Sequence, residues 1–265
     1  MDLYNKIGKT YNTTRKADPL ITSRICDLLT TNSNINGSFL DIGCGTGNYT
    51  IELCHQGLNF TGIDPSQKMI EIAQSKSNEI KWDIGKAEDI GYPNHSFDGA
   101  IATLTIHHWD SLEKSFQQIF RVLKPDSSIV IFTSTTEQME EYWLNYYFPE
   151  MMKASSIKMP SYSKIVQAAK HVEFELITIE KYFIHDDLED LFLYSGKNDP
   201  AKYLDENIRR SISSFAEASS QKEIDNGLKQ LEQDISNNTI EVIKNKFKYD
   251  LGDYMFLVFK KKSID

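Results

Sequence analysis

The chain has 265 residues, of which 40% are hydrophobic and 25% are charged. This length and composition are typical of one globular domain with additions, and they exclude a disordered chain, a collagen-like repeat and a membrane bundle. The net charge of −9 argues against a nucleic acid or a membrane surface as partner. Three cysteines without a paired spacing predict neither a disulfide framework nor a metal site, and with an N-terminus that lacks a signal layout they favour a cytoplasmic protein.

Short apolar segments alternate with helical patterns through the first half of the chain. Strands are expected at residues 39–42, 59–64, 79–84, 97–102 and 128–132, and helices at residues 48–55, 66–75 and 112–123. Such alternation is typical of a parallel sheet with helical crossovers, and these sheets bind ligands at the carboxyl ends of their strands.

The pattern changes after residue 133. Residues 137–165 are rich in methionine and aromatic side chains, residues 174–183 suggest a strand, residues 186–245 read as helices, and residues 254–259 form a last strand. The methionine and aromatic cluster has two interpretations. It packs against the sheet or a partner subunit, or it lines a pocket for an apolar or aromatic acceptor.

The segment from Asp41 to Gly47 joins the first strand to a helix through a glycine-rich turn. Glycines let a ligand approach the backbone, and the helix N-terminus offers free N–H groups. However, Asn48 stands where a dinucleotide fingerprint has its third glycine, and the Asp41 carboxylate would repel a pyrophosphate. Asp64, at the end of the next strand, is placed to accept hydrogen bonds from ribose hydroxyls. The sequence therefore predicts an adenosine-type ligand that carries a positive charge.

Four segments resemble, in order and spacing, the class I S-adenosylmethionine-dependent methyltransferases over about residues 10–135: LDIGCGTGNYT, TGIDPSQKMIEIA, KAEDIGYPNHSFDGAIATLTIHHW and FRVLKP. The resemblance implies a doubly wound, Rossmann-like α/β fold with a seven-stranded, mostly parallel sheet. Its antiparallel last strand, residues 254–259, would lie between the fifth and sixth strands. The resemblance also implies S-adenosylmethionine as cofactor, S-adenosylhomocysteine as product, and in-line methyl transfer to a small-molecule acceptor.

Matching these motifs residue by residue implies a set of cofactor contacts. The methionine moiety would meet Asp41 and the backbone of Gly43, Cys44 and Gly45, and the ribose would meet Asp64. Pro65 and Met69 would pack on the adenine faces, Ala87 and Glu88 would lie at its edge, and Thr103 and Leu104 would lie near the transferred methyl.

Two further features of the resemblance concern the ends of the cofactor. Lys86 stands where many relatives have an acid, so the adenine contact could pass to Glu88, Asp89, Asp83 or a backbone carbonyl. The segment KTYNTTRKADP resembles a leading segment that covers the cofactor, with Tyr11 and Arg15 at the methionine carboxylate. The alternative for Arg15 is a surface position.

A base is needed only if the acceptor loses a proton, and His107 or His108 could then supply it, with structural packing as the alternative. We expect one domain over residues 1–265: cofactor-covering helices at 1–36, a cofactor-binding core at 37–135, and a helical cap at 137–165 and 186–245 that could also mediate a homodimer. Two other functions stay open. One is a catalytically silent protein that binds S-adenosylmethionine or S-adenosylhomocysteine, and the less favoured one is an NAD-dependent oxidoreductase.

Overall fold

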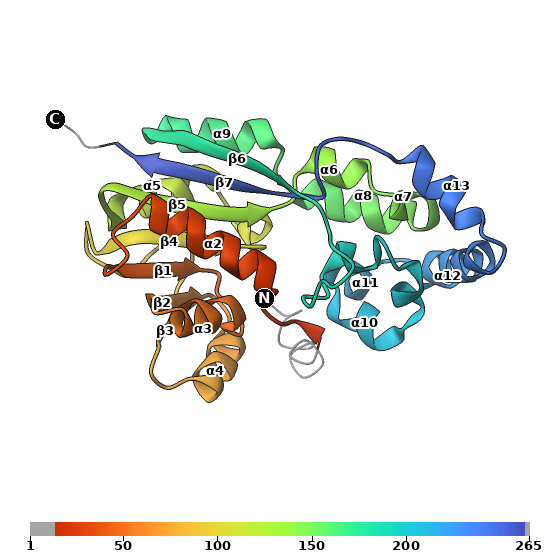
Figure 1. Cartoon of the computed structure of the whole chain (residues 1–265), viewed down its shortest axis with the longest axis horizontal. Coiled ribbons are helices and arrows are strands. Elements are labelled where there is room, and N and C mark those ends of the chain that lie inside the picture. The colour runs from red at the N-terminus through yellow and green to blue at the C-terminus, as the bar shows by residue number, and fades with distance from the viewer. Residues whose placement is uncertain (1–13, 263–265) are drawn as a thin grey trace.

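The computed structural model describes residues 14–262, which form a seven-stranded sheet with helices on both faces (Figure 1). The strands are β1 (Ser38–Ile42), β2 (Asn59–Asp64), β3 (Lys81–Ile84), β4 (Phe97–Thr103), β5 (Leu123–Thr133), β6 (Phe174–Tyr182) and β7 (Tyr254–Lys261). Their order is β3-β2-β1-β4-β5-β7-β6, and β7 runs antiparallel to both of its neighbours. The predicted fold class is confirmed, including an antiparallel last strand between the fifth and sixth.

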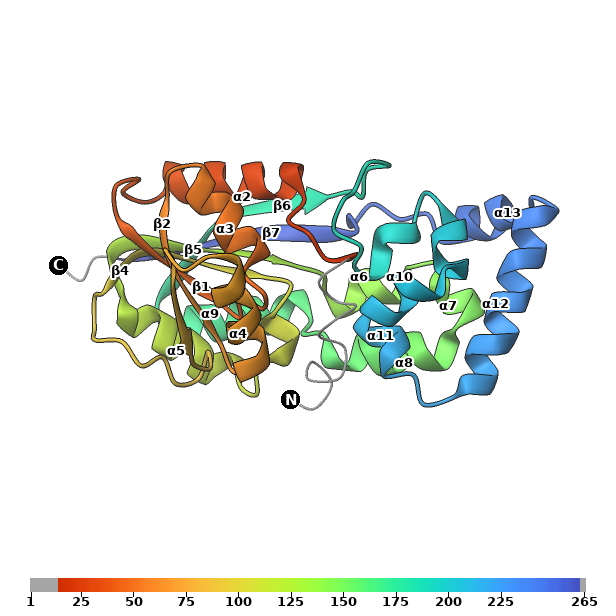
Figure 2. The ribbon, with the colours of Figure 1, turned by 90° about the horizontal axis from the view of Figure 1, so that it is seen from below.

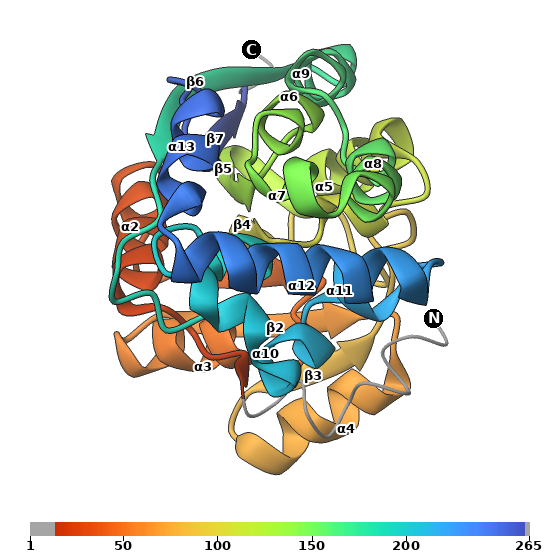
Figure 3. The ribbon, with the colours of Figure 1, turned by 90° about the vertical axis from the view of Figure 1, so that its right-hand side faces the viewer.

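Successive side chains of the central strands enter two different apolar cores. Phe39 packs in the core that contains α2 (Pro19–Thr31) and α3 (Asn48–His55). The next residue, Leu40, packs in the core that contains α5 (Leu112–Val122) and α9 (Tyr162–His171). Figure 3 shows these helix pairs on opposite sides of the sheet. Because both faces are covered, the central strands are apolar along their length and read as continuous hydrophobic segments.

The start of α4 (Gln67–Lys76) involves the Asp64 carboxylate. Pro65 precedes the helix, Ser66 is the N-cap, and the Ser66 hydroxyl accepts from Met69 N. The Ser66 N–H donates to Asp64 Oδ1 at 2.8 Å. The turn that ends β2 is therefore closed by the Asp64 carboxylate itself.

Two insertions form a helical cap at the carboxyl ends of the strands (Figure 2). The first follows β5 and contains α6 (Thr136–Glu140), α7 (Leu144–Tyr147) and α8 (Pro149–Lys158). The second, between β6 and β7, contains η2 (Leu193–Gly196), η3 (Pro200–Leu204), α10 (Glu206–Ser211), α11 (Ser213–Ala216), α12 (Gln221–Ser236) and α13 (Thr239–Lys246). Hydrogen bonds join the two insertions: Tyr147 Oη donates to Asp234 Oδ2 at 3.0 Å, and the Tyr142 and Tyr203 hydroxyls lie 2.6 Å apart. We call residues 136–158 and 193–246 the cap.

Two expectations about the helices need correction. The expected insertion at 137–165 ends at residue 158, because residues 162–165 begin α9, which packs on α5 against the sheet. Residues 1–36 were expected to cover the cofactor, but α2 packs on β4, β5 and α3. An amphipathic helix with buried Ile21, Ile25 and Leu29 is more stable on the sheet than over an open site. Within the described residues of this segment, residues 14–18 lead toward the site.

Packing accounts for most of the methionine and aromatic cluster. Seven members are at most 4% exposed and belong to one apolar core: Met139, Tyr142, Trp143, Tyr147, Phe148, Met151 and Met152. Met139 and Met159 also line a cavity beneath the cap.

None of the helices described between residues 14 and 262 combines the length and apolar character that crossing a membrane requires.

Candidate active site

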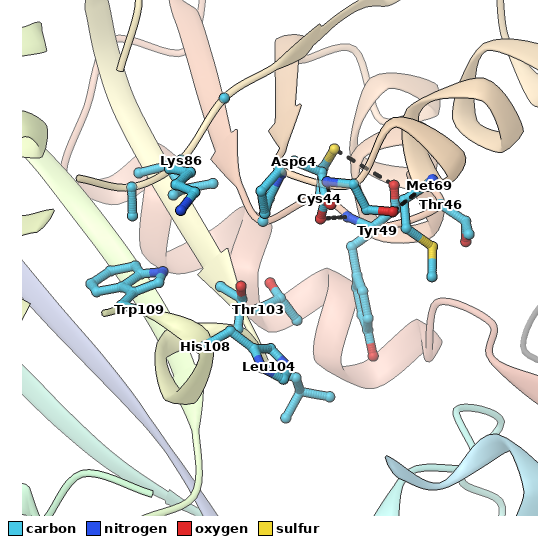
Figure 4. Close-up of a pocket in the computed structure, with 18 of the residues that line it drawn as sticks. Cys44, Thr46, Tyr49, Asp64, Met69, Lys86, Thr103, Leu104, His108 and Trp109 are labelled. Atoms are coloured by element: carbon cyan, nitrogen blue, oxygen red, sulfur yellow. Dashed lines mark hydrogen bonds between the residues drawn. The ribbon is translucent and has the colours of Figure 1, made fainter. Parts of the chain in front are cut away.

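A cavity of about 260 Å³ lies at the carboxyl ends of β1 to β4, where a doubly wound sheet places its ligands (Figure 4). We call it the first cavity. Most of the residues expected at the cofactor line it: Arg15, Gly43, Cys44, Gly45, Asp64, Pro65, Met69, Ala87, Glu88, Thr103 and Leu104. Tyr11 lies outside the described residues. Asp41 is buried in β1 directly before the glycine loop and is not part of the lining.

The glycine loop is held tightly against the end of β2. Gly43 N and Cys44 N both donate to the Ile63 carbonyl, at 2.8 and 3.0 Å. Gly43 has a φ of +75°, and a Cβ added there would lie 2.0 Å from Thr105 Oγ1, so a larger residue cannot keep this geometry. Gly45 also has a positive φ, but a Cβ there would meet no protein atom within 4 Å. The second glycine thus leaves open space at the cavity wall, where a ligand can approach the backbone.

Asp64 is fixed by the backbone on either side of it. Its Oδ2 accepts from Gly45 N at 3.0 Å, and its Oδ1 accepts from Ser66 N. A carboxylate offers about four acceptor positions, so two stay available to hydroxyls of a ligand. Burial raises the pKa of Asp64, and the two backbone N–H groups oppose that shift.

Asp41 is 2% exposed, and Thr50 donates to its Oδ2 at 2.6 Å. No partner for Asp41 Oδ1 occurs within residues 14–262. Burial raises the pKa of Asp41 to about 7, and the nearby Asp64 carboxylate adds to the shift. A cationic group in the first cavity would stabilise the ionised form of Asp41 and lower its pKa, whereas a pyrophosphate would raise that pKa further. These two acids therefore fit a ligand with ribose hydroxyls and a positive charge, as S-adenosylmethionine has.

Figure 4 shows Lys86 and Trp109 at one end of the first cavity, opposite Met69. Lys86 Nζ lies 3.5 Å from Asp110 Oδ2. Glu88 lines the cavity, while its Oε1 accepts from Ser111 N at 3.2 Å at the start of α5. Asp110 also lines this end, so its carboxylate adds another acceptor to this part of the cavity.

The end of β4 carries an unusual backbone conformation. Leu104 has a φ of +53°, a left-handed conformation that costs a branched residue about 1 kcal/mol or more. Leu104 N donates to the Phe132 carbonyl at 2.8 Å, which holds the conformation. Next to it, Thr103 Oγ1 is buried and has no hydrogen-bond partner within residues 14–262. Both residues face the first cavity, so this loop presents a strained backbone and an unused hydroxyl to the ligand.

Arg15 is not at the surface: its side chain is 15% exposed and lines the first cavity. Its guanidinium pairs with Asp190, a residue of the loop between β6 and η2. Sequence reasoning did not single out Asp190, because no motif surrounds it.

A second cavity, of about 100 Å³, lies between the sheet edge and the cap. Arg15, Leu104 and His108 line both cavities, so the two meet at the end of β4. The wall of the second cavity is mixed. Apolar and aromatic side chains come from Met139, Met159, Phe192, Leu193, Ile212 and Tyr254, and hydroxyl side chains come from Thr133, Ser134, Ser155, Ser213 and Ser214. Lys158 and Glu217, which form an ion pair at 2.5 Å, also line it.

His107 and His108 form the short helix η1 (Ile106–His108), with ring centroids 3.9 Å apart. His107 lines the second cavity, and its Nδ1 is buried without a partner in the described part of the chain. Burial, and less strongly the charges of His108, Arg15 and Lys158, lowers the pKa of His107 well below its ordinary value. Burial also lowers the pKa of His108, to about 4. Both rings are therefore neutral at physiological pH.

Sequence reasoning missed several residues that shape the first cavity. Lys76 Nζ donates to the Thr46 carbonyl at 3.1 Å and to Asn48 Oδ1 at 2.6 Å, so it braces the back of the glycine loop. Asn48, seen at first only as a departure from the dinucleotide fingerprint, also donates to the Arg15 carbonyl at 2.9 Å. The helical spacing of Lys76 in α4 could not indicate these contacts.

Comparisons with known proteins agree with this geometry. A family model described as a methyltransferase domain matches residues 40–131. The chain is 30% identical to a proposed methyltransferase of an antibiotic biosynthesis pathway from Anabaena variabilis. The match to its solved structure includes 95% of this chain and 99% of that chain, with a TM-score of 0.81.

Other proteins match over less of their length or at lower identity. O-methyltransferase resE of Aspergillus sclerotiorum is 33% identical over 106 residues, 37% of this chain and 40% of that protein. The chain thus spans less than half the length of the fungal O-methyltransferases that it matches. The geranyl diphosphate C-methyltransferase of Streptomyces coelicolor, solved with S-adenosyl-L-homocysteine, shares the fold. It is 11% identical with a TM-score of 0.57, and the match includes 91% of this chain and 75% of that chain. The chain belongs to the class I S-adenosylmethionine-dependent methyltransferases, and S-adenosylmethionine is its cofactor.

Proposed function

We propose that this methyltransferase acts on a small molecule with an apolar or aromatic body that occupies the second cavity. The observation that carries the proposal is the junction of the two cavities at Arg15, Leu104 and His108. A ligand in each cavity would meet beside the loop that follows β4, which is the arrangement that an in-line displacement requires. The methionine and aromatic side chains of the second cavity's wall suit a hydrophobic body, and the serine and threonine hydroxyls could bind polar groups on it.

The bound cofactor supplies an activated methyl group on a sulfonium, so the chain mainly has to align the acceptor. Asp64, the glycine loop and Arg15 would orient the cofactor, with Asp41 providing negative charge behind the loop. The left-handed Leu104 would fix the wall beside the reacting atoms. Lys158 and Glu217 neutralise one another, so the second cavity favours an uncharged acceptor.

A phenolic hydroxyl is the acceptor group that this site favours. The neutral His107 ring lines the second cavity, and its buried Nδ1 has no partner within residues 14–262, so the ring could take a proton from the acceptor. Its lowered pKa also makes it a weak base, which suits an acidic phenol better than an aliphatic alcohol. Several of the related proteins are named as O-methyltransferases, which supports an oxygen acceptor.

The test is to incubate the protein with S-adenosylmethionine and matched sets of phenols, aliphatic alcohols and amines, and to measure methylated product by mass spectrometry. We expect product with phenols first. Binding of S-adenosylhomocysteine by calorimetry, with no product from any set, would favour the catalytically silent alternative. Tighter binding of NADH than of S-adenosylhomocysteine would favour an oxidoreductase.

A further inference from the structure

Asp190 is a buried carboxylate that the loop between β6 and η2 brings into the first cavity. Its side chain is 1% exposed. Arg15 donates to it from Nε at 2.5 Å and from Nη2 at 3.2 Å, which is a two-point contact that fixes the plane of the guanidinium. Tyr49 Oη donates to Asp190 Oδ2 at 3.1 Å, and burial raises the pKa of Tyr49 well above its ordinary value, so the hydroxyl keeps its proton.

The backbone around this ion pair is also tied in place. Leu191 N donates to the Thr14 carbonyl at 3.1 Å, and Glu189 N donates to Asp18 Oδ2 at 3.0 Å. Asp18 Oδ1 accepts from two N–H groups at the start of α2, so the same side chain caps that helix. Segment 14–18 and loop 188–192 are thus joined on both sides of the ion pair, although about 170 residues separate them in the chain.

The residues that contact or follow Asp190 line both cavities. Arg15 lines both cavities, and Phe192 and Leu193, two and three residues beyond Asp190, line the second one. Tyr49 belongs to the first turns of α3, which follows the glycine loop, and Figure 4 shows its ring among the residues of the first cavity. Asp190 therefore lies between the glycine-loop helix, the leading segment and the wall of the acceptor site.

We propose that Asp190 is a positioning residue for the cofactor: it holds the Arg15 guanidinium where it can bind the carboxylate of the methionine moiety. The proposal rests on the proposed cofactor role of Arg15. Charges then alternate along the site, from Asp190 to Arg15 to the cofactor carboxylate to the cofactor ammonium, with Asp41 behind the glycine loop. A guanidinium has five donors in one plane, so it can serve two carboxylates at once. A region without any motif thereby contributes to cofactor binding.

The test compares two ligands by calorimetry: S-adenosylhomocysteine and its decarboxylated analogue, S-adenosyl-3-thiopropylamine, which keeps the ammonium but lacks the carboxylate. Asp190→Asn should weaken S-adenosylhomocysteine binding by about tenfold, because one charge-assisted contact loses its geometry, and should leave the analogue within about twofold. Asp186→Asn, an exposed acid in the same loop, is the matched control and should change neither. In an Arg15→Gln background, Asp190→Asn should have no further effect on S-adenosylhomocysteine.

The outcomes separate the two proposals. If Arg15→Gln weakens both ligands equally or neither, the cofactor role proposed for Arg15 is wrong. If Arg15→Gln discriminates between the ligands but Asp190→Asn does not, Arg15 keeps its role and the positioning role of Asp190 is wrong. Equal weakening of both ligands by Asp190→Asn would likewise overturn it, because a merely structural residue, or one that binds the ammonium directly, gives that result.

Discussion

The carboxyl edge of the sheet and the cap above it hold their side chains by different means. At the edge, backbone N–H groups and strand ends fix individual polar groups, as for Asp64 between Gly45 N and Ser66 N. In the cap, large side chains fix one another, as for the stacked Tyr142 and Tyr194 rings with centroids 3.8 Å apart. The edge therefore presents specific acceptors and donors to a ligand, whereas the cap presents a shape.

This difference predicts where substitutions act. A change at the edge should alter one interaction with the cofactor, and a change in the cap wall should alter the fit of the acceptor. His107 tests the rule at its boundary, because it belongs to the edge but faces the second cavity.

His107→Ala should have the largest effect. If His107 takes the acceptor proton, kcat should fall by about 10²- to 10⁴-fold, while the affinity for S-adenosylhomocysteine should stay within about twofold. Because burial keeps the pKa of His107 well below its ordinary value, the wild-type rate should show no loss from protonation of this ring near neutral pH. Steady-state kinetics and calorimetry measure the two quantities. His171→Ala, at the exposed end of α9, is the control, and an unchanged kcat in the His107 variant would contradict the proposed base.

Asp64→Ala should have the next largest effect, on cofactor affinity. Removing two charge-assisted hydrogen bonds to the ribose should weaken S-adenosylhomocysteine binding by about 100-fold. The same substitution also frees Gly45 N and Ser66 N, so the melting temperature must be measured beside the affinity. Glu79→Ala, an exposed acid shortly before β3, should leave both values unchanged. Wild-type affinity in a folded Asp64→Ala protein would refute the ribose role.

Asp41 should make cofactor binding depend on pH. Its pKa is about 7 in the ligand-free protein, and the proposed cationic ligand favours the ionised form. Between pH 8 and pH 6, S-adenosylhomocysteine affinity should therefore fall by about tenfold, as the ionised fraction falls. Asp41→Asn should remove this dependence, and calorimetry across that pH range would show it. A pH dependence that persists in the variant would exclude Asp41 as its source.

Ionisation of Asp41 should favour cofactor binding but lower the stability of the ligand-free fold. A carboxyl whose folded-state pKa is raised stabilises the fold while it is protonated, and this contribution is lost as pH rises from about 4 through about 7. At pH 8, Asp41→Asn should therefore raise the melting temperature of the ligand-free protein although it weakens cofactor binding. A lower melting temperature at pH 8 would show that the buried charge is already compensated without ligand.

The two regions also differ in how far the sequence predicts them. The glycine loop and Asp64 are predictable because each lies at the junction of a strand and a helix, and local geometry places it at the sheet edge. Asp190 is not predictable in this way. Its position depends on Arg15 and Tyr49, which are 175 and 141 residues away, and nothing in the local sequence encodes that approach.

The packing partners of the helices are also not predictable from the local sequence. The periodicity of α2 indicates an apolar face but not its partner, so packing on the sheet and covering the cofactor look alike in sequence. The methionine and aromatic cluster likewise reads as either core or pocket, and Tyr142 and Met152 are core while Met159 lies at the second cavity. Burial against a second insertion, remote in the chain, decides between the two.

Met159→Ala should have the smallest effect and the one most confined to the acceptor site. Met159 follows α8 and lines the second cavity, so its loss should enlarge the acceptor site and change the KM of the phenol by about fivefold. Cofactor affinity should not change, because Met159 does not line the first cavity. Ile157→Ala, two residues earlier and 75% exposed, is the control. If Met159→Ala changes cofactor affinity as much as acceptor KM, the cap and the edge are energetically one unit. The contacts of Asp190 would then be the first place to look for the connection, since through them a cap-side loop reaches the first cavity.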